Sequence, residues 1–132
     1  MNRKTFLTTS LGLLGATTWS KTKVKEKYTS NQLIGKESLK LYSHKTPLLT
    51  IAGIAFEKMQ KAALKEGVEL KIISAYRSYD QQKNIWNRKF LKNKKAGLDS
   101  ENNIKKIIEY STLPGTSRHH WGTDVDLIDG SK

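Results

Sequence analysis

The chain has 132 residues, which limits it to one small domain. It contains no cysteine, so a disulfide framework, a thiol nucleophile and a lipidated cysteine anchor are excluded, and a metal ion would need histidine and carboxylate ligands. The formal net charge of +12 favours anionic partners such as nucleic acid, acidic lipid or a cell-wall polymer, or simply a well-solvated surface.

The first residues have the order of features found in an export signal. Arg3 and Lys4 are followed by an apolar stretch at residues 6–16, which is too short to span a bilayer as a mature helix. A buried N-terminal helix is the alternative interpretation. We expect residues 1–20 to be a signal peptide that is removed on export to the bacterial periplasm or cell envelope, leaving no membrane span.

A lysine-rich segment follows the expected signal. Residues 21–30 are polar and typical of a linker, and residues 31–45 show no clear period. No basic-aromatic motif accompanies the lysines, so we do not expect nucleic acid as a partner. We assign residues 21–45 to a basic N-terminal segment and residues 46–132 to the folded domain, which we expect to be monomeric.

A helical period begins at Thr50. Gly67 is well placed to end this helix in a left-handed conformation, and residues 68–74 then alternate apolar and polar like a strand. The apolar face of the helix is predicted to comprise Ile51, Ile54, Ala55, Met59, Ala62 and Ala63.

Two further helices are predicted, one after Ser78, which has capping-box spacing to Gln81, and one capped by Ser100. A polar loop is expected at residues 92–97 and a strand at residues 124–128, after a turn around Pro114-Gly115. The side chains expected to face the core are Ile85, Trp86, Phe90, Ile104, Ile107 and Ile108. These elements predict a small α+β domain with helices packed on a short, mainly antiparallel sheet.

The densest group of reactive side chains lies at residues 117–126, which include two histidines and two aspartates. His119 and Asp126 are seven positions apart, a spacing that suits ligands converging from a loop and the strand after it. Imidazole and carboxylate both bind zinc, and a catalytic zinc site usually takes three protein ligands and a water. Because the same residue types are common in structural turns and caps, these residues alone leave a metal site and a structural role open.

A second polar group, at residues 74–82, follows the predicted strand and opens the next helix. Arg77 can bind a carboxylate through two parallel hydrogen bonds, and Gln82 lies about one helical turn further on. The structural alternative is an ion pair between Arg77 and Asp80 or Glu69.

Together the two segments resemble the VanY-like D-alanyl-D-alanine carboxypeptidases of the M15 (M15B) zinc metallopeptidase family. The resemblance rests on Ser-Ala-Tyr-Arg-Ser at residues 74–78, on Gln82, and on Pro-Gly-Thr-Ser-Arg-His-His-Trp-Gly-Thr-Asp-Val-Asp at residues 114–126. It implies a hedgehog/D,D-peptidase-like fold and a zinc-dependent carboxypeptidase or endopeptidase that acts on the D-alanyl-D-alanine ends of peptidoglycan peptides.

The resemblance also implies residue roles. His119 and Asp126 match the first two zinc ligands, while Arg77, Gln82 and Ser117 match residues at the substrate, with Arg77 facing its terminal carboxylate.

Other residues of the second motif would support the site. Gly122 suits a tight backbone passage between the ligands, and His120 and Trp121 are not ligands in the family pattern but would line or support the pocket. Asp124 stands where the family often has a small residue, and would hold a histidine in place or lie on the surface.

The family pattern continues to a Glu-x-x-His segment that supplies the general base and the third zinc ligand. No such segment follows Asp126 here, and neither Glu37 nor His44 matches it. We therefore expect the C-terminal part of the family domain to be missing from this sequence, and the catalytic base is unassigned. A fragment of an active enzyme and a non-catalytic cell-wall-binding remnant of the same fold are the two interpretations, and zinc binding would separate them.

Overall fold

The computed structural model describes residues 27–131. The expected signal peptide and residues 21–26 lie outside this range. Within it, no helix combines the length and the apolar character needed to cross a bilayer. The elements are, in order, α1 (Ser30–Leu33), α2 (Thr50–Lys65), β1 (Leu70–Ser74), α3 (Tyr79–Lys95), α4 (Ser100–Ile108), the 3-10 helix η1 (Arg118–Trp121) and β2 (Asp126–Asp129).

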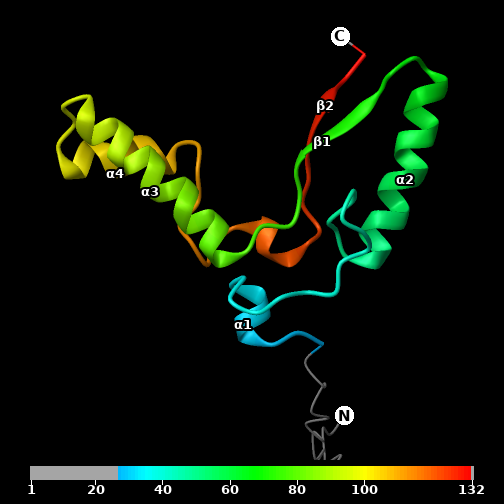
Figure 1. Cartoon of the computed structure of the whole chain (residues 1–132), viewed down its shortest axis with the longest axis horizontal. Helices are drawn as coiled ribbons and strands as arrows, with labels where there is room; N and C mark the ends of the chain where they lie inside the picture. The colour runs from blue at the N-terminus through cyan, green and yellow to red at the C-terminus, as the bar shows by residue number, and fades with distance from the viewer. Residues whose placement is uncertain (1–26, 132) are drawn as a thin grey trace, which may run out of the picture.

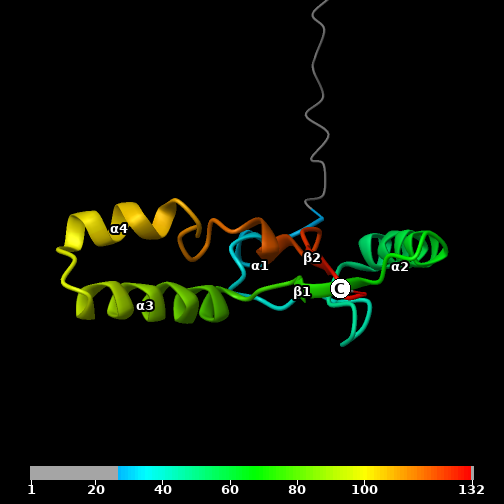
Figure 2. The ribbon, with the colours of Figure 1, turned by 90° about the horizontal axis from the view of Figure 1, so that it is seen from above.

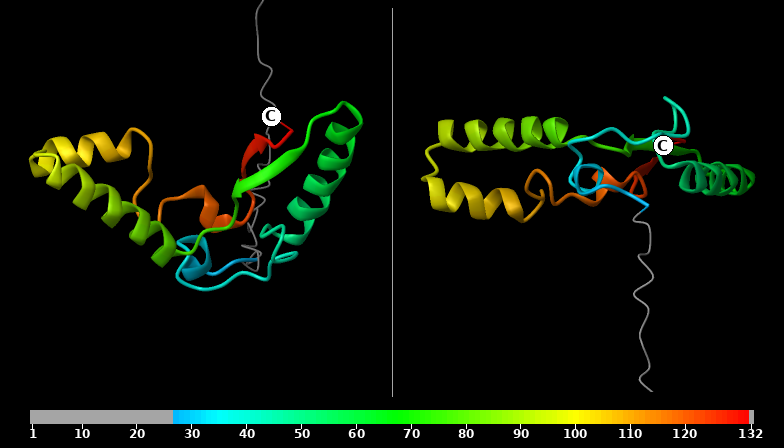
Figure 3. Two further views of the ribbon diagram at one scale, coloured as in Figure 1. Left: turned by 45° about the horizontal axis from the view of Figure 1, so that its top comes forward. Right: turned by 90° about the horizontal axis from the view of Figure 1, so that it is seen from below.

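The two strands form one antiparallel sheet. Leu70 lies opposite Asp129 and Ile72 opposite Leu127, and the register shifts between Ile72 and Ser74. Figure 1 shows α2 beside the sheet on one side and the α3–α4 pair extending away on the other. The same arrangement is seen from above in Figure 2 and from two further directions in Figure 3. The predicted α+β class with a short antiparallel sheet is therefore confirmed.

The ends of α2 and α3 follow from their local sequences. The Gln81 N–H donates to the Ser78 hydroxyl at 3.2 Å, and the Ser78 N–H donates to the Gln81 side chain at 2.8 Å, which is the predicted capping box. Helix α2 ends at Lys65, and Gly67 has a φ of +78°, as its position predicted.

Several predicted boundaries were wrong. Strand β1 begins at Leu70 rather than at residue 68, and β2 spans Asp126–Asp129 rather than residues 124–128. The hydroxyl of Ser100 does not cap α4, because the Asp99 carboxylate accepts the Asn102 N–H at 3.0 Å. Helix α4 therefore begins at Ser100 itself, one residue earlier than predicted. Helix α3 continues to Lys95, through the start of the predicted loop at residues 92–97. Lysine has a good helix propensity, and the positive charges of the three lysines in the last turn of α3 stabilise the helix by interacting with the negative end of its dipole.

Helix α2 buries a different face from the predicted one. Its buried residues are Gly53 and Phe56, while Ile51 is 78% exposed. The close approach of Tyr42 fixes this orientation, since a Cβ on Gly53 would lie 2.7 Å from the Tyr42 ring. The predicted stripe thus lies mainly on the exposed side of α2 in the described structure: Ile51, Ile54, Ala55, Met59 and Ala62 are exposed and Ala63 is half-buried.

The apolar core is small. Leu48, Phe56 and Ala75 form its buried cluster, called the apolar cluster below, and partly buried apolar side chains pack around it: Ala52, Ile72, Val125 and Leu127. Among the described residues, the buried polar side chains outnumber these three: Thr46, Gln82, Asn103, Ser117 and His120. Because buried polar groups are costly unless they are hydrogen-bonded, their partners define much of the fold.

The α3–α4 pair is an example. Asn103 is fully buried on α4, where its amide accepts from the Asn93 side chain at 2.9 Å and donates to the Phe90 carbonyl of α3 at 2.8 Å. Ile107 is buried as predicted. The other predicted core residues are less enclosed: Ile85, Trp86 and Phe90 are half-buried, and Ile104 and Ile108 are exposed.

Candidate active site

The site is organised where the chain leaves β1 and meets η1. Three hydrogen bonds join the two segments in alternation. The Ala75 carbonyl faces Nδ1 of His119 at 2.8 Å, the Arg77 N–H donates to the His119 carbonyl at 3.1 Å, and the Arg77 carbonyl faces Nδ1 of His120 at 2.5 Å. We call these contacts between residues 75–77 and η1 the polar seam. The seam ties the candidate metal ligand His119 and the candidate substrate residue Arg77 to one rigid piece of backbone.

The seam also fixes which nitrogen of His119 is available. A carbonyl can only accept, so Nδ1 carries a hydrogen, and in the neutral imidazole the lone pair is then on Nε2. Nε2 lies 3.4 Å from a carboxylate oxygen of Asp126, the first residue of β2. The His119 side chain is only 16% exposed, whereas that of Asp126 is 58% exposed, so the pair lies at the edge of solvent.

This pair fits a shared metal ion. Two electron-rich atoms at this distance repel one another unless a proton or a cation lies between them. Two ligands of a tetrahedral zinc, each at roughly 2.0–2.1 Å from the metal, would be separated by about 3.4 Å. The distance between Nε2 and the carboxylate oxygen is the same 3.4 Å. Within residues 27–131, however, no group of three histidine or carboxylate side chains is gathered as a metal site.

Arg77 lies beside this pair. Its Nη1 donates to the Gln82 side-chain oxygen at 2.6 Å, its Nη2 donates to the Ser74 hydroxyl at 2.7 Å, and Nη2 is 3.9 Å from the Asp126 carboxylate. These two bonds use two of the five guanidinium N–H donors. The alternative partners Asp80 and Glu69 are not the ones observed. The guanidinium is thus held in a fixed orientation with donors left for a ligand.

Gln82 is fully buried in the first turns of α3. While its oxygen accepts from Arg77, its amide nitrogen donates to the Thr112 carbonyl at 2.7 Å and lies 3.4 Å from the Ser111 hydroxyl. Its role as a substrate contact remains a prediction, and the contacts observed are those of a residue that orients Arg77.

His120 is fully buried and engaged at both ring nitrogens. The Gly115 N–H donates to Nε2 at 3.0 Å, so Nδ1 bears the hydrogen that reaches the Arg77 carbonyl. A Cβ on Gly35 would lie 2.5 Å from Nδ1, and Gly35 has a φ of +76°. His120 thus packs between the backbones of Arg77 and Gly115, and no local pattern in the sequence indicated that Gly35 is its neighbour.

An open cleft of about 490 Å³ surrounds the ligand pair. Arg77, His119 and Asp126 line it together with buried Ser117 and with residues 108–112. Five predicted residues, with Gln82 behind Arg77, thus converge on one region. His44 and Glu37 lie elsewhere: His44 lines a separate groove, and Glu37 accepts from the Thr29 hydroxyl at 2.8 Å.

Two other residues of the motif shape the backbone between the ligands. Gly122 has a φ of +66°, as its predicted role in a tight passage requires. Asp124 is paired with Arg118 across this turn through contacts of 2.9 and 3.0 Å, and its contacts are with Arg118 rather than with a histidine. This pair closes the loop that carries His119 toward Asp126.

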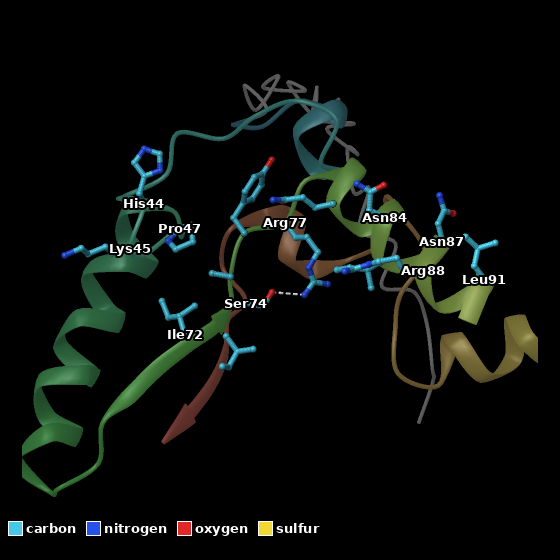
Figure 4. Close-up of a pocket in the computed structure, with 15 residues that line it drawn as sticks. His44, Lys45, Pro47, Ile72, Ser74, Arg77, Asn84, Asn87, Arg88 and Leu91 are labelled. Carbon is cyan, nitrogen blue, oxygen red and sulfur yellow. Dashed lines mark hydrogen bonds between the residues drawn. The ribbon is translucent and has the colours of Figure 1, made fainter. Parts of the chain in front are cut away.

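A larger groove of about 890 Å³ adjoins the cleft at Arg77. It runs between the 44–47 segment, β1 and one face of α3, and Figure 4 shows the side chains that line it. Tyr76 lines this groove, and partial burial raises the pKa of its phenol.

Comparisons with known proteins identify the family of this chain. Residues 47–132 match the family described as VanY, D-alanyl-D-alanine carboxypeptidase. A curated relative, "Putative carboxypeptidase YodJ" of Bacillus subtilis (strain 168), is 38% identical over 80 residues, which cover 61% of this chain.

Solved structures share the fold. The vancomycin resistance D,D-pentapeptidase VanY from a VanB-type cassette, in complex with Zn(II), has a TM-score of 0.62 at 25% identity over 70% of this chain. VanYB in complex with D-alanine-D-alanine has a TM-score of 0.65 at 22% identity over 81% of this chain. The LD-carboxypeptidase LdcB has a TM-score of 0.52 at 33% identity over 71% of this chain.

The chain is shorter than the proteins it matches. It spans 26% of the length of the Bacillus relative, 52% and 55% of the two VanY structures, and 40% of the LdcB structure.

Proposed function

Because the chain belongs to the VanY family of D-alanyl-D-alanine carboxypeptidases, we propose that it contributes to zinc-dependent hydrolysis of the D-alanyl-D-alanine ends of peptidoglycan peptides. The observation that carries this proposal is the separation of 3.4 Å between Nε2 of His119 and the Asp126 carboxylate, beside the oriented guanidinium of Arg77. Relatives solved with Zn(II) and with D-alanine-D-alanine support the choice of metal and substrate.

His119 and Asp126 would hold the zinc ion. When bound, zinc would polarise the scissile carbonyl and lower the pKa of a water. The chain's part is to present the two ligands already oriented. The Ala75 carbonyl fixes the His119 tautomer with Nε2 free, and the pairing of β2 with β1 fixes the Asp126 backbone.

Arg77 would bind the terminal carboxylate of the peptide. Its guanidinium is held by Gln82 and Ser74, so little side-chain freedom is lost when a carboxylate binds. Gln82 would act through Arg77, while buried Ser117 lines the cleft near the scissile bond in the proposed pose. Hydrogen bonds from a fixed arginine set the distance between the peptide terminus and the metal ligands.

A second candidate is a non-catalytic protein that binds cell-wall peptides with the same cleft. It is favoured by one observation, that residues 27–131 bring together two metal ligands rather than three. In this case Arg77 would retain the peptide and no hydrolysis would follow.

Hydrolysis separates the two candidates. The chain is prepared alone and extended at its C-terminus by the Glu-x-x-His segment of a solved relative, and release of D-alanine from a D-alanyl-D-alanine peptide is measured with added zinc. We expect chelator-sensitive turnover in the extended protein and its loss in His119→Ala. Binding of the peptide without turnover in both forms would favour the second candidate, and turnover that survives His119→Ala would contradict both.

Arg77→Lys gives the first quantitative prediction. In the extended protein, lysine keeps the charge but loses the two-pronged geometry, so kcat/KM should fall by an amount equivalent to about 1–3 kcal/mol. Circular dichroism must show an unchanged fold. Unchanged kinetics would assign Arg77 a structural role.

We further propose that residues 1–20 direct export, that residues 21–45 link the signal to the domain, and that residues 46–132 carry the peptidase function outside the cytoplasm. A reporter fused after residue 25 tests the first point. Retention of that reporter in the cytoplasm would contradict it.

A further inference from the structure

The groove beside β1 has no role in the function proposed so far. Its volume is about 890 Å³. One wall is formed by Ile72, Ile73 and Ser74 of β1, and the facing wall by one face of α3, where Asn84 and Arg88 are one turn apart. Figure 4 shows these side chains around the hollow.

The groove is cationic. His44, Lys45, Arg77 and Arg88 line it, and its lining contains no aspartate or glutamate. Arg77 is partnered by Gln82 and Ser74, but Arg88 has no ion pair or side-chain hydrogen bond with any other residue in the range 27–131. In Figure 4 the Arg88 side chain extends from α3 toward Arg77. Two guanidinium groups directed toward one region, without a carboxylate on the walls, favour an anionic ligand.

The groove adjoins the candidate active site, because Arg77 lines both. Arg88 is nine residues along α3 from Tyr79, the first residue of that helix. At 1.5 Å per residue this is about 14 Å, and the reach of Arg88 back toward Arg77 shortens the gap between the two charged groups. An extended peptide covers roughly 3.3–3.6 Å per residue, so the gap corresponds to about two to four residues.

The walls are suited to a peptide. The lining combines the apolar side chains of Pro47, Ile72 and Ile85 with the amides of Asn84 and Asn87. Within the described chain, β1 pairs with β2 alone, and the Leu70 carbonyl also accepts from Gln60 Nε2 at 2.8 Å. The part of β1 that lines the groove, residues 72–74, can receive an extended backbone on its other edge. A nucleic acid is less suited, because the lining contains Tyr76 but no other phenylalanine, tyrosine or tryptophan on which bases could stack in succession.

We propose that this groove binds the part of the substrate that precedes the scissile bond, and that Arg88 recognises a second carboxylate two to four residues before the peptide's C-terminus. The proposal rests on the function proposed above, which sets the terminal carboxylate at Arg77. It makes the substrate class an acidic peptide with two carboxylates at a defined spacing, and Arg88 a specificity-determining residue.

The test measures binding by the full chain in the presence of a chelator, so that no peptide is consumed. Fluorescently labelled pentapeptides ending in D-alanyl-D-alanine carry D-glutamate, or uncharged D-glutamine, at two, three or four residues before the C-terminus. Their dissociation constants are determined by fluorescence anisotropy for the unchanged chain, for Arg88→Gln and for Lys58→Gln. The last variant removes the same charge from the exposed side of α2 and is the matched control.

At one of the three positions, a peptide with glutamine in place of glutamate should bind about tenfold more weakly, as expected for loss of a charge-assisted hydrogen bond. This loss of affinity should be seen both with the unchanged chain and with the Lys58→Gln variant. In Arg88→Gln the same replacement should change binding less than twofold. Equal weakening by Arg88→Gln and Lys58→Gln would show a net-charge effect and overturn the proposal, as would no preference for glutamate at any position. A labelled single-stranded oligonucleotide that binds tighter than every peptide and loses affinity in Arg88→Gln would overturn it in favour of nucleic acid.

Failure of this proposal is distinguishable from failure of the function. Capping the terminal carboxylate as an amide probes Arg77 in the same assay. If the cap weakens binding while the glutamate replacement does not, the Arg88 proposal is wrong and the function stands. The opposite result has three parts: the preference for glutamate depends on Arg88, the amide cap does not change binding, and the extended protein does not hydrolyse peptides. In that case the groove binds acidic peptides but the proposed function is wrong.

Discussion

The polar seam and the apolar cluster hold the same stretch of chain by different forces. On one side, the Ala75 side chain packs with Leu48 and Phe56. On the other, the Ala75 carbonyl and both backbone groups of Arg77 are bonded to η1. The free energy of burying apolar groups depends little on how those groups are oriented, whereas a hydrogen bond weakens when its angle departs from the preferred range. The difference indicates that the apolar cluster supplies stability and the seam supplies the geometry of the ligands.

The apolar cluster can be broken at Phe56, which is 4% exposed. Phe56→Ala should lower the free energy of unfolding by about 3–5 kcal/mol, because so small a cluster cannot fill the resulting space. Ile51→Ala, on the exposed side of the same helix, should change it by less than about 0.5 kcal/mol. Urea unfolding followed by circular dichroism measures both. Similar losses in the two variants would contradict the assignment of the buried face of α2.

The seam can be strained at Gly35 without touching the ligands. Gly35→Ala would place a Cβ 2.5 Å from Nδ1 of His120 at a φ of +76°. The left-handed conformation costs about 1–2 kcal/mol and the overpacking about 1–3 kcal/mol, giving a total of about 2–5 kcal/mol. Gly67→Ala is the matched control, since its φ is +78° and nothing lies within 4 Å of the added Cβ. Gly67→Ala should lower the free energy of unfolding by the cost of the left-handed conformation alone. Equal losses of stability in the two variants would mean that His120 is not confined by Gly35.

The smallest expected effect is a pH dependence at the start of α4, remote from both regions. Hydrogen bonds from the backbone and then the side chain of Asn102 hold the pKa of Asp99 below its usual 3.8. Because the folded-state pKa is lowered, the capping contribution is complete above the unfolded pKa and is lost as the pH falls through the folded-state value. Asn caps helices but does not titrate, so the difference in urea midpoint between the unchanged chain and Asp99→Asn should shrink from pH 7 to pH 3. A difference independent of pH would contradict the cap.

The sequence predicted the parts of this fold that depend on near neighbours. The capping box at Ser78, the left-handed Gly67 and the antiparallel pairing of two short strands were all foreseen, because turn chemistry and alternation are local. The buried face of α2 was not foreseen, since its apolar residues surround much of the helix and Tyr42 decides which side is covered.

The candidate site shows the same division. His119, Asp126 and Arg77 were selected by motif, and the structure brings them together, although their roles stay predictions. The contacts that orient them were beyond the sequence. Nothing local indicates that the Ala75 carbonyl sets the His119 tautomer, that Gln82 is buried against Arg77, or that Arg88 is left without a partner within residues 27–131.

The central claim is that His119 and Asp126 supply two ligands of a zinc site, and zinc titration calorimetry of the full chain tests it most directly. We expect weak binding of one zinc per chain, weakened at least tenfold in His119→Ala and in Asp126→Ala. His44→Ala removes a histidine that lines the separate groove and should leave binding unchanged. Zinc affinity that survives loss of His119 and Asp126, or that disappears with His44, would contradict the account.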